Sequence, residues 1–400
     1  MRVLIVTGFI PSSGGGGVER HVYDLACGLM RRGVDVTIAC EDRQNFSADY
    51  SDIKDKLLTV RVSEHHFLGA GLLRKSSKLS LLMDSGKYAW HMLRRSWLLS
   101  RSFNPDDFDI IHGNAEHGLF PLLKNRLRHG KRPIMVNTMH GTVLGVFHRM
   151  RKYRLTPPIP MPDQAVGIAM DCGSAWMANA CIAVSRNVAI EATTLYHLPK
   201  ERVNTIYNWT DKQKFYPHDK AKARKALGLD PDEKYLFFVG RADAIKGYGL
   251  LLKAMEYVDR DAQLIVASSV TGKLGEAKMK NVRVLGRVGE DVLPLYYSAC
   301  DLFMFPSVYE GLPLTLIEAI SCGAVPVCMN LPPMTEIVDD TNGYMCERFD
   351  PIAFADTVNR ALRDEDRAEK SRLCVETSKK FDMDRSIDAT LALYQSLLRR

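Results

Sequence analysis

The sequence lacks several features that would place the protein outside the ordinary globular class. Its nine cysteines never form a Cys-x-x-Cys pair, so they indicate neither a disulfide framework nor a zinc site, and we expect a protein of the reducing cytosol. No apolar run is long enough to cross a membrane. The longest weakly charged stretch, 164–185, is interrupted by Asp171 and Asn179 and predicts a buried helix followed by a strand. The apolar run 3–6 is too short for a signal peptide and has no cleavage site after it.

Motifs of the common nucleotide-binding folds are also missing. The glycine run 14–17 fails the dinucleotide fingerprint, because Glu19 or Arg20 stands where the last glycine is required. No Gly-Lys pair is followed by the Ser or Thr of a P-loop. No nucleic-acid-binding motif accompanies the basic residues, so we expect no nucleic-acid partner. By itself the glycine run indicates either a flexible turn or a place where backbone amides bind an anion at a helix start.

The positive charge of the chain is confined to its first half. Residues 1–200 hold 26 basic and 17 acidic side chains, a net charge of +9, whereas residues 201–400 have a net charge of −2. Seven basic residues lie among leucines and tryptophans at helical spacing between 74 and 101: Arg74, Lys75, Lys78, Lys87, Arg94, Arg95 and Arg101. Such a helix either lies on an anionic membrane, or packs its Leu and Trp face on its own domain with the Arg heads in solvent. Periodicity does not separate the two.

What the sequence does contain is a regular alternation of short aliphatic runs and helical patterns. This alternation is typical of parallel sheets with crossover helices, and 400 residues suffice for two such α/β domains. The strands expected are 2–7, 35–39, 58–62, 108–112, 134–138, 180–184 and 203–206 in the first sheet, and 235–239, 263–267, 282–285, 302–305, 325–328 and 343–346 in the second. The polar stretch 208–219 and the helical pattern 220–227 predict the connection between the domains, and a last helix is expected at 385–398.

Charged side chains follow strands of the second expected sheet, where ligands bind in open parallel sheets. Arg241 ends one strand and Lys246 follows it in a loop, and two such cations can bind a diphosphate. Glu310 follows another strand at the mouth of a helix. Glu318 lies two turns inside that helix among apolar residues, so we expect hydrogen-bonding partners for it. A carboxylate can accept two hydrogen bonds from the diol of a ribose or hexose, and a helix amino terminus favours phosphate. The alternative is a set of solvated surface charges.

Taken together, these motifs resemble one family. The pattern Glu310-x7-Glu318, followed by Cys322-Gly323, Pro326-Val327, Glu336-Ile337-Val338 and Asn342-Gly343, is similar to the retaining nucleotide-sugar glycosyltransferases of family four, the glycosyl transferases of group 1. The likeness includes His140-Gly141, Gly240-Arg241 and Lys246-Gly247. It implies the GT-B fold, an α/β architecture of two Rossmann-like domains facing across a cleft. The acceptor-binding domain is expected at 1–207, the donor domain at 208–384, and a helix that returns to the amino-terminal domain at 385–400.

The resemblance also implies roles for individual residues. Arg241 and Lys246 are expected to bind the donor diphosphate, Glu318 the ribose hydroxyls, and Glu310 the transferred sugar. His140 is expected near the anomeric carbon, although a hydrogen-bonded histidine at a strand end is the alternative. The catalytic residues so implied are His140, Arg241, Lys246 and Glu310. The donor-binding residues so implied are Gly15, Gly16, Arg241, Lys246, Arg287, Glu310, Gly311, Leu312, Leu314 and Glu318.

The implied reaction moves a hexosyl or other glycosyl group from a UDP-, GDP- or ADP-sugar to an acceptor, with retention of the anomeric configuration. Cations and helix dipoles stabilise the leaving diphosphate, and no metal ion or cofactor is expected. The positive charge of the acceptor domain favours a lipid-linked or other anionic acceptor, such as a polysaccharide or glycolipid precursor. It also favours a cytoplasmic protein that binds the inner face of the cell membrane. The alternatives are another GT-B enzyme, such as a nucleotide-sugar epimerase, and a non-catalytic sugar-nucleotide or membrane-surface binding protein.

Two segments depart from the family pattern. Asn208-Trp209-Thr210-Asp211 stands where the family has Asn-Gly-Val-Asp, so a conformation that glycine permits is either adopted with an indole or abandoned. Pro332-Pro333-Met334-Thr335 replaces the glycine pair that commonly precedes the position of Glu336. The second departure leaves the backbone contacts near the sugar, and hence the identity of the sugar, open.

Overall fold

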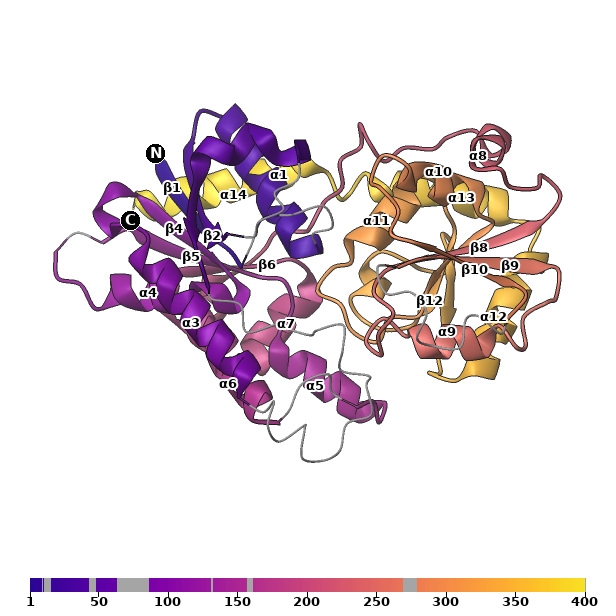
Figure 1. The fold of residues 1–400 in the computed structure, drawn as a ribbon, viewed down its shortest axis with the longest axis horizontal. Helices are drawn as coiled ribbons and strands as arrows, with labels where there is room; N and C mark the ends of the chain where they lie inside the picture. Colours follow the sequence, from indigo (N-terminus) through magenta and orange to yellow (C-terminus); the bar gives the residue numbers. More distant parts are fainter. Residues whose placement is uncertain are drawn as a thin grey trace. The chain divides into compact units, whose positions relative to one another are not determined.

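The computed structural model describes residues 1–400 except 9, 11–15, 43–47, 63–85, 131, 157–160, 269–278 and 400. The chain divides into two compact units. The amino-terminal unit comprises Met1–His148, Pro157–Tyr207 and Asp384–Arg400, and the carboxy-terminal unit comprises Arg149–Thr156 and Asn208–Met383. Each unit is built around one parallel sheet with helices on both faces (Figure 1). The prediction of two Rossmann-like α/β domains is confirmed.

The sheet of the amino-terminal unit has seven parallel strands in the order β3-β2-β1-β4-β5-β6-β7. The strands are β1 (Arg2–Val6), β2 (Asp35–Glu41), β3 (Leu57–Val60), β4 (Ile110–Asn114), β5 (Ile134–Met139), β6 (Ala180–Ala183) and β7 (Val203–Thr205). The direction of winding reverses between β1 and β4. In doubly wound sheets, the loops at the carboxyl ends of two such strands diverge and leave room for a ligand.

Helices cover both faces of this sheet (Figure 1). The α-helices are α1 (Gly17–Arg31), α3 (Lys87–Arg101), α4 (Leu119–Arg126), α5 (Val143–Lys152), α6 (Met161–Met177), α7 (Arg186–Thr194) and α14 (Met383–Leu398). The 3-10 helices are η1 (Ala48–Lys56), η2 (Pro105–Asp107), η3 (Ala115–Gly118) and η4 (Lys200–Arg202). Helices α3, α4 and α6 pack together on one face, and α1 and α14 lie on the other.

The sheet of the carboxy-terminal unit has six parallel strands in the order β10-β9-β8-β11-β12-β13, which reverses between β8 and β11. The strands are β8 (Lys234–Val239), β9 (Ala262–Ala267), β10 (Val282–Gly286), β11 (Leu302–Phe305), β12 (Pro326–Met329) and β13 (Tyr344–Cys346). The helices are α8 (Lys220–Leu227), α9 (Tyr248–Ala254), α10 (Leu293–Ala299), α11 (Leu314–Ser321), η6 (Met334–Glu336), α12 (Pro351–Arg363) and α13 (Arg367–Ser378). Each of the thirteen expected strand segments overlaps an observed strand, because buried parallel strands are short, near-continuous apolar runs.

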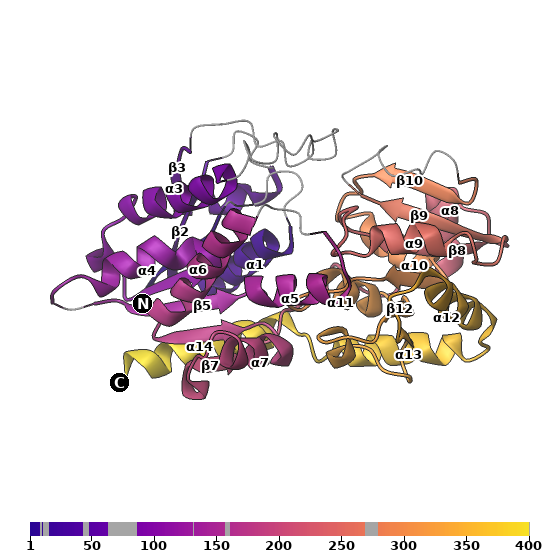
Figure 2. The same ribbon diagram turned by 90° about the horizontal axis from the view of Figure 1, so that it is seen from below.

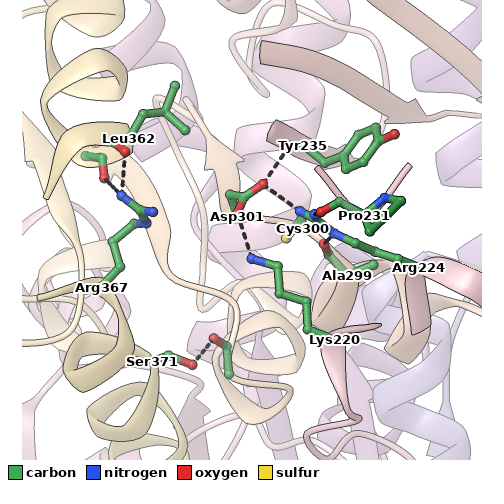
Figure 3. Close-up of polar contacts among 12 residues, drawn as sticks. Lys220, Arg224, Pro231, Tyr235, Ala299, Cys300, Asp301, Leu362, Arg367 and Ser371 are labelled. Atoms are coloured by element: carbon green, nitrogen blue, oxygen red, sulfur yellow. Dashed lines mark hydrogen bonds and ion pairs between the residues drawn. The ribbon is translucent and has the colours of Figure 1, made fainter. Parts of the chain in front are cut away.

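The polar connection at 208–219 leads into α8, which is tied to the sheet by a partly buried network around Asp301 (Figure 3). The Asp301 carboxylate accepts hydrogen bonds from Lys220 Nζ at 2.6 Å, Arg224 Nη2 at 2.9 Å and the backbone N–H of Tyr235 at 2.7 Å. Arg224 also donates to the carbonyl of Ala299 at 3.1 Å. This basic helix is therefore part of the architecture of the unit rather than a free surface charge.

The last helix, α14, belongs to the amino-terminal unit although its residues end the chain. Figures 1 and 2 show it, in yellow, among the elements of that unit. Gly28 on α1 permits the close approach, since a Cβ there would lie 2.1 Å from Cδ1 of Ile387. Arg32 pairs with Asp388 at 2.5 Å. On its inner side, the hydroxyl of Tyr394 lies 2.5 Å from Nδ1 of His112 on β4.

The segment Arg149–Thr156 differs from the expected domain boundary. The sequence assigned it to the amino-terminal domain, but it belongs to the carboxy-terminal unit. The physical reason is a ring contact within that unit, in which Tyr153 packs against Phe349 with centroids 5.2 Å apart.

Among the described residues, no helix is both long and apolar enough to span a membrane.

Candidate active site

Four of the five charged residues predicted for the donor site, all except Arg287, follow β8 and β11, the two strands between which the carboxy-terminal sheet reverses. Arg241 and Lys246 lie in the loop after β8, and Glu310 lies in the loop after β11. The two loops are joined directly, since the backbone N–H of Val308 donates to the carbonyl of Ile245 at 2.9 Å. Because β8 and β11 are parallel neighbours, the loops that follow them leave the same edge of the sheet. Two cations and a carboxylate are therefore brought to that edge.

A glycine makes this close approach of the loops possible. Gly247, directly before α9, has a φ of +67°, a conformation that residues with a side chain rarely adopt. A Cβ at this position would lie 2.1 Å from the carbonyl oxygen of Pro306, which no relaxation of a side chain could relieve. The local structure therefore explains the motif Lys246-Gly247. The loop that carries Lys246 can pack against the loop after β11 only because glycine follows the lysine.

Lys246 and Glu310 form an ion pair in which Nζ and Oε1 are 2.7 Å apart. The side chains are 22% and 10% exposed, so the pair is screened less from its surroundings than a surface pair would be. Asp243 braces the same loop. Its Oδ1 accepts from the backbone N–H of Lys246 at 2.9 Å, and its Oδ2 lies 2.8 Å from Nε of Arg241. Sequence reasoning missed Asp243, although an acidic residue between two cations was a visible signal.

Glu318 lies on α11, which begins immediately after Pro313. The Tyr297 hydroxyl, on α10, donates a hydrogen bond to Glu318 Oε2 at 3.1 Å. Burial raises the pKa of Tyr297 well above its ordinary value, and the neighbouring Glu318 carboxylate raises it further, so the phenol remains a donor. Tyr297 thus supplies a partner of the kind expected for a carboxylate inside an apolar helix.

The other residues predicted for the donor site lie in the loop before α11, at the start of that helix, and beyond the edge strand. Gly311 and Leu312 are buried in the loop before α11, and Leu314 is the first residue of that helix. Arg287 follows β10, the edge strand, which is separated from β8 by β9, and it is exposed. The structure therefore gathers Arg241, Lys246 and Glu310 around β8 and β11 and places Arg287 at the far edge of the same sheet.

The segment that departs from the family pattern, 208–211, lies against the same loop. Asn208 Nδ2 donates to the carbonyl of Leu312 at 2.9 Å. Trp209 is 3% exposed and does not have a positive φ, so the conformation that glycine permits is abandoned and the indole is packed inside. The Pro332-Pro333 bond, in the second departing segment, is cis.

In the amino-terminal unit, the predicted residues follow β1 and β5. Gly16 is exposed and directly precedes α1, whereas Gly15 lies outside the described residues. His140 follows β5, and its Nε2 is 3.0 Å from Oδ1 of Asn114, the last residue of β4. The ring of His21, from α1, stands edge-on to that of His140 with centroids 4.7 Å apart. The site around His140 is thus built from three elements.

His140 is held in its neutral form. Burial lowers the pKa of His140 to about 4, the nearby Glu116 carboxylate acts in the opposite direction, and His117 lowers the pKa further. At neutral pH the imidazole can therefore exchange hydrogen bonds but carries no charge to offer a phosphate. The predicted function of His140 in positioning a sugar is compatible with this state, and its role stays a prediction.

Beside His140, a second polar group joins η3 to α3. The Arg95 guanidinium lies 3.3 Å from Nδ1 of His117 and 3.4 Å from Oε2 of Glu41. Gly8, two residues after β1, leaves room for the His117 ring, because a Cβ at Gly8 would lie 2.6 Å from Nε2 of His117. Arg95 is 7% exposed, so it does not belong to the basic surface in which the sequence placed it.

The outer face of α3 is occupied by a regular stripe. Lys87, Trp90, Arg94, Trp97 and Arg101 recur at intervals of three and four residues, and we call them the α3 stripe. Trp90 and Trp97 are 48% and 44% exposed. The guanidinium carbon of Arg94 lies 4.9 Å from the centre of the Trp90 ring, and that of Arg101 lies 4.9 Å from the centre of the Trp97 ring. The two indoles are therefore about half exposed and lie beside arginines of the same helix. Arg74, Lys75 and Lys78 lie outside the described residues.

The chemistry available in the carboxy-terminal unit is recognition of an anion beside a polyol. Two cations, one carboxylate in an ion pair and one carboxylate that accepts from a phenol lie in or between the loops and helices that follow β8 and β11. The described residues contain no group of three or more His, Cys, Asp or Glu side chains arranged to hold a metal ion.

Comparison with known proteins identifies the fold and the family. Residues 15–214 match the family described as Glycosyltransferase Family 4, and residues 219–381 match Glycosyl transferases group 1. A D-inositol 3-phosphate glycosyltransferase of Catenulispora acidiphila is 26% identical over 424 residues, which cover 99% of this chain and 95% of that protein.

Two solved structures show the same fold over the whole chain. The sucrose-phosphate synthase of Thermosynechococcus elongatus superimposes with a TM-score of 0.74 at 20% identity, covering 100% of this chain and 99% of that one. Anabaena HepE, solved in complex with UDP-glucose, superimposes with a TM-score of 0.70 at 17% identity, covering 98% of this chain and 99% of that one. The two-unit architecture is therefore that of GT-B glycosyltransferases.

Proposed function

The chain belongs to the family 4 glycosyltransferases, the glycosyl transferases of group 1, and from this membership we propose that it transfers a sugar from a nucleoside-diphosphate sugar to an acceptor with retention of the anomeric configuration. The observation that carries the proposal is the Lys246–Glu310 ion pair at the reversal point of the carboxy-terminal sheet, with Arg241 in the same loop. This arrangement sets a cation for phosphate and a carboxylate for sugar hydroxyls side by side.

In the proposed reaction, the bond between the anomeric carbon and the diphosphate oxygen breaks, and a bond from that carbon to the acceptor oxygen forms on the same face. The proton of the acceptor hydroxyl passes to the departing phosphate oxygen. Lys246 and Arg241 stabilise the charge that develops on this oxygen, so they act mainly in the transition state. Glu318 accepts hydrogen bonds from the ribose hydroxyls, and Glu310 accepts from the transferred sugar while it keeps Lys246 in place.

Two observations from relatives support the substrates. HepE was solved with UDP-glucose, which favours a UDP-sugar as the first donor to test. The Catenulispora relative is named for D-inositol 3-phosphate, a phosphorylated polyol. An anionic acceptor, including a lipid-linked one, suits the net charge of +9 on residues 1–200. We propose no metal ion and no cofactor, because cations and the amino terminus of α11 supply the positive charge that the leaving group requires.

The experiment that tests this function is a panel of UDP-, GDP- and ADP-sugars. A donor that binds only the folded protein raises its melting temperature, and the same donor should then be hydrolysed slowly in the absence of an acceptor. The anomer of the first product, read by NMR, decides between retention and inversion. Binding without any turnover would favour a sugar-nucleotide binding protein, and conversion of the sugar in place would favour an epimerase.

We further propose an anionic membrane surface as a partner, and with it a cytoplasmic protein at the inner face of the cell membrane. The supporting observation is the α3 stripe, in which exposed indoles and basic side chains share one face of a helix. Indoles favour the interface between lipid and water, and each basic residue near an anionic bilayer contributes about 1 kcal/mol. Lys87, Arg94 and Arg101 together would then contribute about 3 kcal/mol.

A further inference from the structure

One side chain determines how His140 is held, and it was not predicted from the sequence. Asn114 is completely buried at the end of β4, and its Oδ1 lies 3.0 Å from Nε2 of His140. Its amide Nδ2 donates to the carbonyl oxygen of Val6 on β1, 3.2 Å away. A backbone carbonyl can only accept, so this second bond fixes which end of the amide faces His140.

The orientation of this amide decides the tautomer of the imidazole. Because Oδ1 of Asn114 only accepts hydrogen bonds, Nε2 of His140 must carry the proton of that bond. A neutral imidazole with its proton on Nε2 has an unprotonated Nδ1. We propose that Asn114 is a positioning residue, which holds His140 in the Nε2–H tautomer and so makes Nδ1 the acceptor of a hydrogen bond from a substrate hydroxyl. The tautomer stands independently, whereas the substrate contact rests on the proposed function.

The backbone around Asn114 supports this assignment. Ala115, the next residue, has a φ of 47°, a left-handed conformation that is uncommon for residues other than glycine. This turn ends β4 and starts η3 at once, so Asn114 is the last residue of the strand. In the register of the sheet, Asn114 is opposite Thr138 of β5, and His140 lies two residues beyond. Backbone strain of this kind persists only where the surrounding structure over-determines the conformation.

Burial favours the neutral form of His140, and the charged and titratable groups that face the ring act in both directions. Glu116 on η3 favours the protonated form, whereas His117 on the same turn opposes it. His112 on β4 also interacts unfavourably with a charged His140, and the ring of His21 on α1 lies edge-on to it. Burial lowers the pKa of His140 to about 4, so the ring is neutral at pH 7 and has a tautomer to select.

The test is a 15N NMR spectrum of the full chain labelled at histidine. The His140→Gln variant assigns the signals of His140. At pH 7 the expected result is a pyridine-like Nδ1 and a pyrrole-like Nε2. Asn114→Ala should populate both tautomers and lower kcat about 10-fold, the effect of one lost hydrogen bond. Asn114→Asp keeps an acceptor and adds a charge, so it should restore the tautomer, raise the pKa of His140 and move the acid limb of the pH–rate profile upward.

A matched control separates positioning from stability. Asn125 is also completely buried in the amino-terminal unit, and its Nδ2 donates to the carbonyl of Pro133 at 3.0 Å. Asn125→Ala should lower the melting temperature as Asn114→Ala does, without changing the histidine spectrum or the pH–rate profile. A proton on Nδ1 in the wild type, or an Asn114→Ala variant with wild-type tautomer and kcat, would overturn the inference.

Donor hydrolysis without an acceptor shows which substrate carries the hydroxyl that donates to Nδ1 of His140. If it belongs to the donor sugar, Asn114→Ala lowers hydrolysis and transfer alike. If it belongs to the acceptor, only transfer falls. A chain that turns over no donor sugar at all would refute the proposed function, while the tautomer of His140 would still be decided by the spectrum.

Discussion

Lys246 and Glu310 are 64 residues apart in the chain, and their side chains are joined at 2.7 Å. The pair exists because β8 and β11 are neighbours in the sheet, although β9 and β10 lie between them in the sequence. The Asp243 carboxylate accepts a hydrogen bond from the backbone N–H of Lys246 and so fixes the backbone of that loop. The ion pair then fixes the two side chains against each other. A change at one end of the pair therefore alters the other.

Removing the cation should abolish most of the activity. We expect Lys246→Ala and Arg241→Ala each to lower kcat by about 100-fold, because a lost charge-assisted contact to a developing oxyanion is worth about 3 kcal/mol. Steady-state kinetics with the donor found in the panel provide the measurement. Lys234→Ala is the matched control, since Lys234 forms an ion pair of the same length with Asp261 in the same unit, on the surface. If Lys246→Ala and Arg241→Ala both retain wild-type turnover, the diphosphate assignment fails.

The second carboxylate should affect binding more than turnover. Glu318→Gln preserves the shape of the side chain but weakens its acceptance of two hydroxyls, so the Kd for the nucleoside diphosphate should rise about 10-fold. Isothermal titration calorimetry measures the change. Tyr297→Phe is the control, because it removes the phenol that donates to Glu318 and leaves the carboxylate itself. A Kd equal to that of the wild type in Glu318→Gln would indicate a structural carboxylate.

Transfer should proceed without divalent metal ions. In the proposed function, Arg241, Lys246 and the amino terminus of α11 would supply the positive charge that the leaving diphosphate requires. The initial rate in excess EDTA should equal the rate in MgCl2 after the protein has been dialysed against chelator. An EDTA-sensitive rate that Mg²⁺ restores would contradict the metal-free mechanism.

The α3 stripe should bind anionic vesicles at low ionic strength and be released by salt. Co-sedimentation with phosphatidylglycerol vesicles, at low and high NaCl, measures the bound fraction. Arg94→Glu/Arg101→Glu should abolish binding and Trp90→Ala/Trp97→Ala should weaken it. Arg95 must be left unchanged, because it is buried against Glu41 and its replacement would disturb the fold. A wild-type protein that stays in the supernatant at low salt would favour a soluble acceptor.

Acid should destabilise the amino-terminal unit through its buried histidines. The pKa values of His112, His117 and His140 are lowered by burial to about 3, 4 and 4, whereas an unfolded histidine titrates near about 6.5. These three groups take up protons on unfolding, so the stability they contribute is lost as pH falls from 6.5 toward 4. Asp171 opposes them, because burial raises its pKa to about 7 and it releases a proton on unfolding.

The net uptake of about two protons near pH 5 predicts that the free energy of unfolding falls by about 3 kcal/mol per pH unit. Urea unfolding followed by tryptophan fluorescence between pH 5 and 6.5 measures this slope. His129→Gln, at an exposed position, should leave the slope unchanged. Stability that rises as the pH is lowered over this range would contradict the burial of the three rings.

The architecture could be predicted because its signals are local. Each buried strand is a short apolar run, and the motif residues Arg241, Lys246 and Glu310 follow strands directly. The contacts of Asp243 and Asn114 could not be predicted in this way, although an acidic residue between two cations was visible in the sequence. Their roles depend on distances to residues of other loops and strands, and a short polar residue after a strand is common in any α/β protein.

Arg95 shows a second limit of prediction from the sequence. Helical periodicity identifies which residues share a face, but it does not say which face is buried. In α3 the buried face includes Arg95 because Glu41 of β2 supplies a carboxylate and His117 a ring nitrogen. The tryptophans, which a hydropathy argument would bury, are on the outside. Similarly, the segment Arg149–Thr156 is assigned to the carboxy-terminal unit, where Tyr153 packs against Phe349, a residue almost two hundred positions later.

The return of α14 to the first unit has a consequence for synthesis of the chain. A ribosome that releases residues in order delivers β1 to β7 first, the entire carboxy-terminal sheet next, and α14 last. Until then His112 has no Tyr394 to contact, and the side of α1 around Gly28 faces water. The amino-terminal unit therefore cannot complete its packing until the carboxy-terminal sheet has been synthesised, and its uncovered surface is open to chaperones and proteases during that interval.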